Sequence, residues 1–178
     1  IGIKLAQKCK VKHVWHFREM QDIGLNLRPY SGWSRWYKLA GESDAVICIS
    51  HTIANHYNKV RNPFVIYDAV SDQKSLLYEN DKEDYFLFCG SIIPSKGVET
   101  AIDAFSLFNK VRKGYKLIIA GEVNVMPSYY EDLRRRISHL ELIREVEFLG
   151  FRKDVSHLMF KAQALLMCSF NEGLGRVT

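Results

Sequence analysis

Short apolar runs alternate with amphipathic stretches through the second half of the chain. In residues 95–113 the apolar side chains recur at steps of three and four, which places them on one face of a helix. Residues 128–142 and 154–163 repeat this pattern and predict two further helices. The apolar runs are typical of buried parallel strands, and they occupy residues 85–92, 116–123, 146–151 and 164–169. This alternation predicts right-handed crossovers and a doubly wound α/β sheet, which binds ligands beyond the carboxyl ends of its strands.

The first half of the chain shows the same alternation less completely. It resembles the end of another α/β domain. We expect strands at 11–17, 45–50 and 64–70, and helices at 32–43 and from His51 onward. Residues 71–84 are polar and rich in charge, which favours a linker. We therefore predict one Rossmann-like domain over residues 1–70, a linker over 71–84 and a second Rossmann-like domain over 85–178.

The composition fits a folded protein. With 47% hydrophobic residues, the 178-residue chain can bury one ordinary core or parts of two smaller ones, and neither disorder nor a fibrous repeat fits. No apolar run approaches the roughly 18 residues that a membrane span requires. Because the chain starts at Ile1 and stops at Thr178 within an expected element, we interpret it as a piece of a longer protein whose terminal signals cannot be read.

Cysteine and histidine usage predicts a reduced cytosol and no metal site. The four cysteines include no C-x-x-C pair, and the six histidines lack the spacing of a zinc site. The D-x-x-D pair of Asp81 and Asp84 falls in the predicted linker, where we interpret it as a solvated charge cluster. The net charge of +5 suits an anionic partner, which charge alone leaves open as a phosphorylated small molecule, nucleic acid or an acidic membrane surface.

The segment "GSIIPSKG" at 90–97 outlines an anion site. A strand end runs through Pro94 and Ser95, the expected N-cap, into a helix that would point its free N–H groups at the strand-end crevice. Lys96 adds a mobile ammonium. A lysine about 4 Å from a phosphate contributes about 4 kcal/mol at an effective dielectric near 20, against roughly 0.3 to 1 kcal/mol for the helix dipole. The alternative is a capped helix with a solvated lysine.

The closing segment "SFNEGLGRVT" at 169–178 brings Glu172 to the same edge of the expected sheet. Asn171 precedes it, and Gly173 and Gly175 would let backbone amides approach a ligand closely. A carboxylate accepts hydrogen bonds from hydroxyls, whereas amides and cations suit phosphates, so the two loops together indicate a sugar and a phosphate. The alternative is a glutamate that complements the dipole of a following helix.

The aromatic and basic segment "LRPYSGWSRWYK" at 27–38 suits a membrane surface or a lipid-linked acceptor. Its aromatic residues Trp33, Trp36 and Tyr37 share one helical face, however, which favours internal packing. The run of three arginines at 134–136 is interpreted as a solvated helix face.

Four motifs in order resemble the retaining GT-B glycosyltransferases of glycosyltransferase family 4, also called glycosyl transferases group 1. The family pattern "G-R-x-x-x-x-K-G", a strand ending in "AG", a strand ending in "FLG", and "P-S-x-x-E-G-F-G" correspond here to "GSIIPSKG", "IIAGE", "EFLGF" and "CSFNEGLGRVT". The first half resembles the end of the family's N-terminal domain more weakly, through "VWHFREM", "SDAVICIS" and "VIYDAV". The resemblance implies an α/β fold of GT-B type.

The resemblance also assigns roles to single residues. Lys96 matches the cation that stabilises the donor diphosphate, Glu172 the carboxylate that holds donor-sugar hydroxyls, and His16 the N-domain histidine near the reacting sugar. The other donor-binding positions that it implies are Gly90, Ser91, Gly97, Gly121, Phe151, Arg152, Asn171, Gly173, Leu174, Gly175 and Arg176. No metal and no cofactor is implied.

Two positions depart from the family pattern. Ser91 stands where the pattern has an arginine beside the diphosphate, so one leaving-group cation is missing; Arg152 and Arg176 are the candidates to replace it. Cys168 stands in place of proline.

The implied activity is transfer of a sugar, with retention, from a UDP or GDP sugar to a hydroxyl of a sugar or a lipid-linked acceptor. We expect a role in surface polysaccharide or glycoconjugate synthesis, a cytoplasmic location with peripheral contact to an anionic membrane as an option, no nucleic-acid partner, and an inactive fragment when the piece stands alone. Two alternatives stay open. One is a non-catalytic nucleotide-sugar-binding fragment, and the other is a dinucleotide-binding oxidoreductase, for which "GLGRVT" offers a truncated G-x-G-x-x-T.

Overall fold

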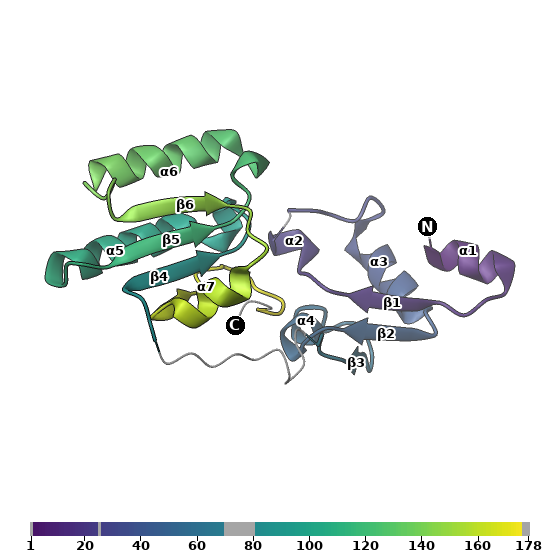
Figure 1. The fold of residues 1–178 in the computed structure, drawn as a ribbon. Helices are drawn as coiled ribbons and strands as arrows, with labels where there is room; N and C mark the ends of the chain where they lie inside the picture. The colour runs from purple at the N-terminus through teal and green to yellow at the C-terminus, as the bar shows by residue number, and fades with distance from the viewer. Residues whose placement is uncertain (1, 25, 70–80, 176–178) are drawn as a thin grey trace. The chain divides into compact units, whose positions relative to one another are not determined.

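The computed structural model describes residues 2–24, 26–69 and 81–175, and the chain forms two compact units (Figure 1). The first unit comprises residues 1–70 and 171–176, and the second comprises residues 71–170 and 177–178. The predicted linker lies mostly outside the described residues.

The first unit contains a parallel sheet with the strand order β1-β2-β3. Its strands are β1 (Val14–Phe17), β2 (Ala45–Cys48) and β3 (Phe64–Val65), and its helices are α1 (Gly2–Cys9), α2 (Gln21–Gly24), α3 (Gly32–Gly41) and α4 (His51–His56). The predicted strands and helices of this half are confirmed in kind. The strand expected over 64–70 is only two residues long, and the short helices α1 and α2 were not predicted from the sequence.

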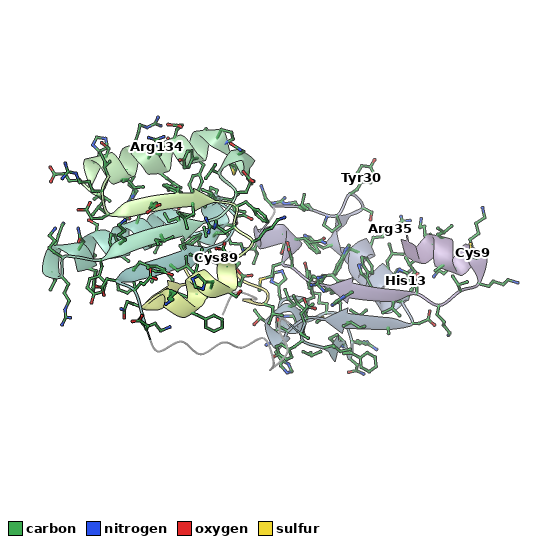
Figure 2. The ribbon with its side chains drawn as sticks, viewed as in Figure 1. Cys9, His13, Tyr30, Arg35, Cys89 and Arg134 are labelled. Atoms are coloured by element: carbon green, nitrogen blue, oxygen red, sulfur yellow. The ribbon has the colours of Figure 1, made fainter. Side chains whose placement is uncertain are left out.

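A cluster of aromatic side chains contributes to the core of the first unit. Trp36 from α3 packs on Phe17 from β1 and on Tyr57, with ring centroids 4.9 and 5.1 Å apart, and Trp33 contacts Trp36 at 5.4 Å. Internal packing of the tryptophans of segment 27–38 is therefore confirmed. Tyr30, in contrast, extends fully into solvent from the loop before α3 (Figure 2).

The second unit contains a parallel sheet with the order β6-β5-β4-β7. The strands are β4 (Tyr85–Cys89), β5 (Lys116–Ala120), β6 (Val146–Gly150) and β7 (Ala164–Leu166). The helices are α5 (Val98–Val111), α6 (Pro127–His139) and α7 (Val155–Lys161), with the 3₁₀ turns η2 (Pro94–Lys96) and η3 (Val123–Val125). The doubly wound sheet predicted for this half is confirmed.

Side chains of β4 alternate between two apolar layers, as expected for a central strand. Phe88 packs in the layer formed with α5 and α6, whereas Leu87 packs in the layer formed with α7. Figure 1 shows the same arrangement, with α5 and α6 on one face of the sheet and α7 on the other. Helices on both faces leave the carboxyl ends of the strands as the place where loops can build a site.

Candidate active site

The loops at the carboxyl ends of the second sheet are joined by main-chain hydrogen bonds. The Gly90 amide donates to the Ala120 carbonyl at 3.0 Å, and the Gly121 amide donates to the Gly150 carbonyl at 2.9 Å. The fold thus brings together the loops after β4, β5 and β6, which carry several of the predicted donor-binding residues.

Gly121 occupies a position where no side chain fits. A Cβ atom at Gly121 would lie 1.9 Å from the Gly90 carbonyl oxygen and 3.1 Å from Cδ1 of Ile92. Since the first of these neighbours is backbone, the close fit between the β4 and β5 loops requires glycine at 121.

Gly97 makes an equally close contact with the loop after β7. Its φ of +70° is in the left-handed region, and a Cβ atom would lie 2.1 Å from the Cys168 carbonyl oxygen. Near this contact, the Phe170 amide donates to the Ser95 carbonyl at 3.0 Å. The loop with Lys96 therefore lies directly against the loop that leads to Glu172.

The expected N-cap at Ser95 is wrong. Residues 94–96 form the 3₁₀ turn η2, in which the Lys96 amide donates to Ile93 and the Gly97 amide donates to Pro94, both at 3.0 Å. The helix α5 starts only at Val98, with Gly97 at the N-cap. Proline favours a first turn but the left-handed glycine interrupts it, so the long helix begins two residues later than expected.

The first turn of α5 also contains a carboxylate. Glu99 is half-buried and accepts a hydrogen bond from the hydroxyl of Tyr129 on α6. Lys96, half-buried in the turn just before the helix, is the predicted diphosphate cation of this loop.

Arg152 lies in the exposed turn after β6, next to Phe151, which is 69% exposed. Both arms of its guanidinium contact the Asp154 carboxylate, at 2.8 and 2.6 Å. The hydrogen bond from Arg152 lowers the pKa of the Asp154 carboxyl below its usual value. Arg152 could replace the missing arginine only if its guanidinium released Asp154 or bonded the diphosphate and Asp154 at the same time. Ser91 is exposed, and Arg176 lies outside the described residues.

The segment that carries Glu172 groups with the first unit. Gly173 lies so close to this unit that a Cβ atom would be 2.9 Å from Cδ1 of Ile53 and 3.1 Å from the Arg18 carbonyl oxygen. The Ser50 hydroxyl donates to the Gly173 carbonyl at 2.5 Å and accepts from the Ile53 amide. Leu174 packs against the aromatic core. Glu172 and Gly175 are half-buried, and Asn171 is exposed.

His16 is exposed near the carboxyl end of β1, and its backbone pairs with Ile47 of β2. Two residues further on, Arg18 forms an ion pair with Asp68 after β3, with one contact at 3.0 Å. The first unit thus holds His16 and the segment 172–175, whereas the second holds Lys96 and the glycine loops.

Sequence reasoning missed Ser50 and the pair of Arg18 and Asp68. Ser50 carries a readable signal, because a serine that follows an apolar strand and precedes a helix is typical of an N-cap, and its hydroxyl does cap α4. The ion pair joins residues 50 positions apart, which no local pattern indicates.

Across residues 2–24, 26–69 and 81–175, no three or more His, Cys, Asp or Glu side chains are grouped as metal ligands. None of the helices in that part of the chain combines the length and apolar character of a membrane span.

Comparison with known proteins identifies relatives of one enzyme class. The family described as "Glycosyl transferases group 1" matches residues 71–178. An uncharacterized glycosyltransferase of Methanocaldococcus jannaschii is 31% identical over 179 residues, covering 99% of this chain and 48% of the relative. A GalNAc-alpha-(1->4)-GalNAc-alpha-(1->3)-diNAcBac-PP-undecaprenol alpha-1,4-N-acetyl-D-galactosaminyltransferase of Campylobacter jejuni is 31% identical over 117 residues, covering 65% of this chain and 30% of the relative.

A solved structure shows the same fold. HepE of Anabaena, determined in complex with UDP-glucose, superposes with a TM-score of 0.77 at 21% identity, covering 99% of this chain and 52% of that one. The chain therefore spans about half the length of HepE, and half or less of these curated relatives. Since the matched family covers the whole C-terminal part and the archaeal relative nearly all of the chain, the oxidoreductase alternative is set aside. This chain belongs to the glycosyl transferases group 1 family, and its fold is of GT-B type.

Proposed function

We propose that the protein transfers a sugar, with retention at the anomeric carbon, from a UDP or GDP sugar to an acceptor hydroxyl. The observation that carries this proposal is the set of interlocked loops at the carboxyl ends of the second sheet, in a chain of a glycosyltransferase family. These loops hold Lys96 beside close-packed glycines, the combination that suits a diphosphate.

The main barrier in such a transfer is the charge that develops on the leaving diphosphate. Lys96 would stabilise this charge together with backbone amides at the start of α5, a helix of 14 residues. Groups held in place before the reaction contribute most to such stabilisation, and removal of one often costs about a hundredfold in rate. The Gly97 contact with Cys168 fixes the backbone next to Lys96 and so supports this role. In this scheme the protein needs no metal and no cofactor.

Glu172 would accept hydrogen bonds from hydroxyls of the donor sugar. Its segment is held by the bond from Ser50 to Gly173 and by the packing of Leu174. His16, exposed at the end of β1, would act near the reacting sugar.

We further propose a lipid-linked or saccharide acceptor in glycoconjugate or surface polysaccharide synthesis, at the cytoplasmic face of a membrane. The Campylobacter relative is named for its activity on an undecaprenol-linked glycan, which supports such an acceptor. A groove of about 540 Å³ between α1 and α3, lined by Lys4, Arg35 and Lys38 with Glu42, supplies basic surface for contact with anionic lipid.

Calorimetric titration of the full-length protein with UDP, GDP and inorganic phosphate tests the donor site. We expect one nucleotide to bind and Lys96→Ala to weaken it by about tenfold or more, because an ion pair with phosphate is lost. Glu172→Ala should spare the nucleotide and weaken its sugar conjugate. Lys110→Ala, at the far end of α5, is the matched control and should change nothing.

Unchanged nucleotide binding in both variants would contradict the assignment and leave the loops as simple helix caps. If nucleotide sugars bind normally but no transfer or hydrolysis is detected, the non-catalytic alternative holds instead. Where transfer occurs, the anomeric configuration of the first-formed product, read by NMR, decides between retention and inversion.

A further inference from the structure

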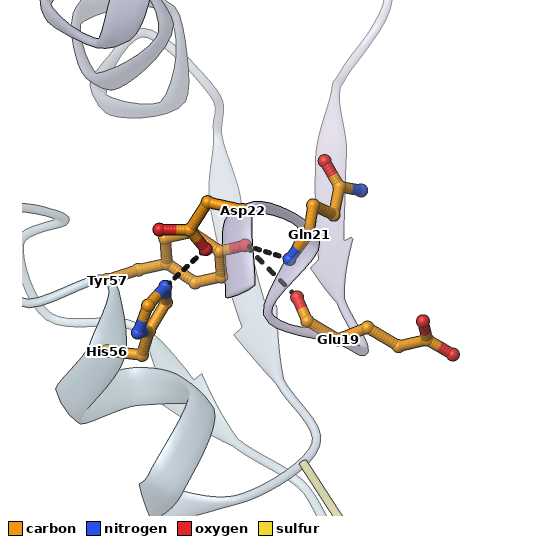
Figure 3. Close-up of polar contacts among 5 residues, drawn as sticks. All are labelled: Glu19, Gln21, Asp22, His56 and Tyr57. Carbon is orange, nitrogen blue, oxygen red and sulfur yellow. Dashed lines mark hydrogen bonds and ion pairs between the residues drawn. The ribbon is translucent and has the colours of Figure 1, made fainter. Parts of the chain in front are cut away.

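The backbone that follows β1 is held by the hydroxyl of Tyr57. This hydroxyl donates to the Glu19 carbonyl at 3.0 Å and accepts from the Gln21 amide at 3.1 Å (Figure 3). Tyr57 is 2% exposed, and its ring packs on Phe17 at 5.0 Å. One buried side chain therefore satisfies two main-chain groups of the segment after β1.

A second contact ties the same segment to the same helix end. The Nε2 atom of His56 lies 2.7 Å from Oδ1 of Asp22, and both side chains are partly buried (Figure 3). His56 and Tyr57 are adjacent at the C-terminal end of α4, and the ring of His56 packs edge-on against Tyr57 at 4.7 Å. We call residues 18–22, which run from the end of β1 into the first turn of α2, the β1 loop. The contacts fix it at three points, which are the Glu19 carbonyl, the Gln21 amide and the Asp22 side chain.

The β1 loop lies next to two of the predicted catalytic residues. It begins two positions after His16, and its first carbonyl, that of Arg18, is the group that would meet a Cβ atom of Gly173 at 3.1 Å. Gly173 directly follows Glu172. A shift of the β1 loop would consequently displace the backbone at His16 and at Glu172 together.

We propose that Tyr57, assisted by the pair of His56 and Asp22, is a positioning residue that aligns His16 and Glu172 for sugar transfer. This inference rests on the proposed function. A buried tyrosine also contributes to stability, and comparing kcat with nucleotide affinity separates the two roles. Misplacement of reacting groups by about 1 Å can cost about a hundredfold in rate, so loosening this loop should appear in turnover.

The test compares Tyr57→Phe and Asp22→Asn with the unsubstituted full-length protein. Release of UDP or GDP, with transfer of the sugar to water, is measured with UDP-glucose, UDP-N-acetylglucosamine and GDP-mannose, and binding of the free nucleotide is measured by calorimetry. We expect kcat to fall at least fivefold in both variants while the Kd of the nucleotide stays within twofold, because Lys96 and the glycine loops proposed to bind the diphosphate belong to the second unit.

Tyr85→Phe is the matched control. Tyr85 is also buried and donates its hydroxyl to a backbone carbonyl, that of Leu158 at 2.7 Å, but it lies at the start of β4, away from the carboxyl-end loops. Its turnover should remain normal. Asp22→Asn, at a half-buried site, keeps the test valid if Tyr57→Phe fails to fold.

Normal kcat in Asp22→Asn and in folded Tyr57→Phe would overturn this inference and leave the proposed function intact. Equal losses of kcat and nucleotide affinity, or an equal loss of kcat in Tyr85→Phe, would also overturn it, because they would indicate general destabilisation. Absence of turnover in the unsubstituted protein would overturn the proposed function and, with it, this inference.

Discussion

At the scale of single residues, the candidate donor site depends on backbone more than on side chains. Gly121 and Gly97 allow one loop to touch another at distances that no Cβ atom permits. These two positions of the motifs therefore require glycine for a steric reason, whether or not a ligand binds there.

Substitution of Gly121 by alanine should disrupt the edge of the second sheet. The new Cβ atom would meet backbone 1.9 Å away, so the β4 and β5 loops must separate. We expect a loss of about 1 to 3 kcal/mol, as for other overpacked positions, and a clear loss of nucleotide binding. Thermal unfolding and calorimetric titration measure the two effects.

Gly41→Ala is the paired control for that substitution. Gly41 ends α3 and has no atom within 4 Å of an added Cβ, so alanine should be neutral or stabilise by up to about 1 kcal/mol. If both variants behave alike, the steric argument for Gly121 is wrong.

At the scale of helices and strands, apolar periodicity identified most elements but not where they end. The apolar run predicted a strand over residues 85–92. The strand β4 stops at Cys89, because the chain turns at Gly90 towards the β5 loop. The helix expected from Ser95 starts at Val98, since a 3₁₀ turn and a left-handed glycine come first. Local hydrogen bonds set these boundaries, and a hydrophobic pattern does not contain them.

The same limit applies to the candidate site. Residues such as Lys96 and Glu172 stand in motifs and were found from the sequence, although their roles stay predictions. Tyr57 and Asp68 are remote in sequence from the segments they contact, so only the fold brings them into view.

The hydrogen bond from Tyr129 on α6 to Glu99 on α5 leads to a prediction about pH dependence. Burial and the bond to Glu99 raise the pKa of the Tyr129 hydroxyl well above its ordinary value near 10. The neutral tyrosine is thus favoured in the folded state, and its contribution is complete below pH 10 and is lost as the pH rises through the higher folded value. Tyr129→Phe should cost about 1.5 to 3 kcal/mol at pH 8, as for hydrogen bonds to charged groups.

Urea unfolding of both proteins between pH 8 and pH 11 measures this contribution. The difference in unfolding free energy should shrink above pH 10. A difference that stays constant across this range would show that folding does not raise the pKa of this hydroxyl. Tyr130→Phe on the same helix serves as the control.

At the scale of the whole molecule, the net charge of +5 on these 178 residues favours contact with anionic surfaces. The basic groove of the first unit, which contains Lys4 and Arg35, is the surface that we expect to contact anionic lipid. Charge alone would also suit many other anions. We expect the full-length protein to sediment with phosphatidylglycerol vesicles at low salt and to be released as salt is raised.

The double variant Lys4→Glu/Arg35→Glu should weaken this sedimentation by about thirtyfold or more, since each basic residue near an anionic surface contributes about 1 kcal/mol. Arg134→Glu/Arg135→Glu on α6 makes the same change of charge in the second unit and should have a smaller effect. Equal effects of the two pairs would indicate nonspecific attraction rather than a face that binds membrane.

The main-chain bonds between the strand-end loops have a consequence for enzyme engineering. The bonds from Gly90 to Ala120 and from Gly121 to Gly150 involve no side chain, whereas Ser91 and Phe151 beside them are exposed. Substitutions at Ser91 and Phe151 should therefore leave these main-chain hydrogen bonds intact. Libraries randomised at 91 and 151 should retain folded members in high proportion, and under the proposed function they would test whether these two positions select the donor.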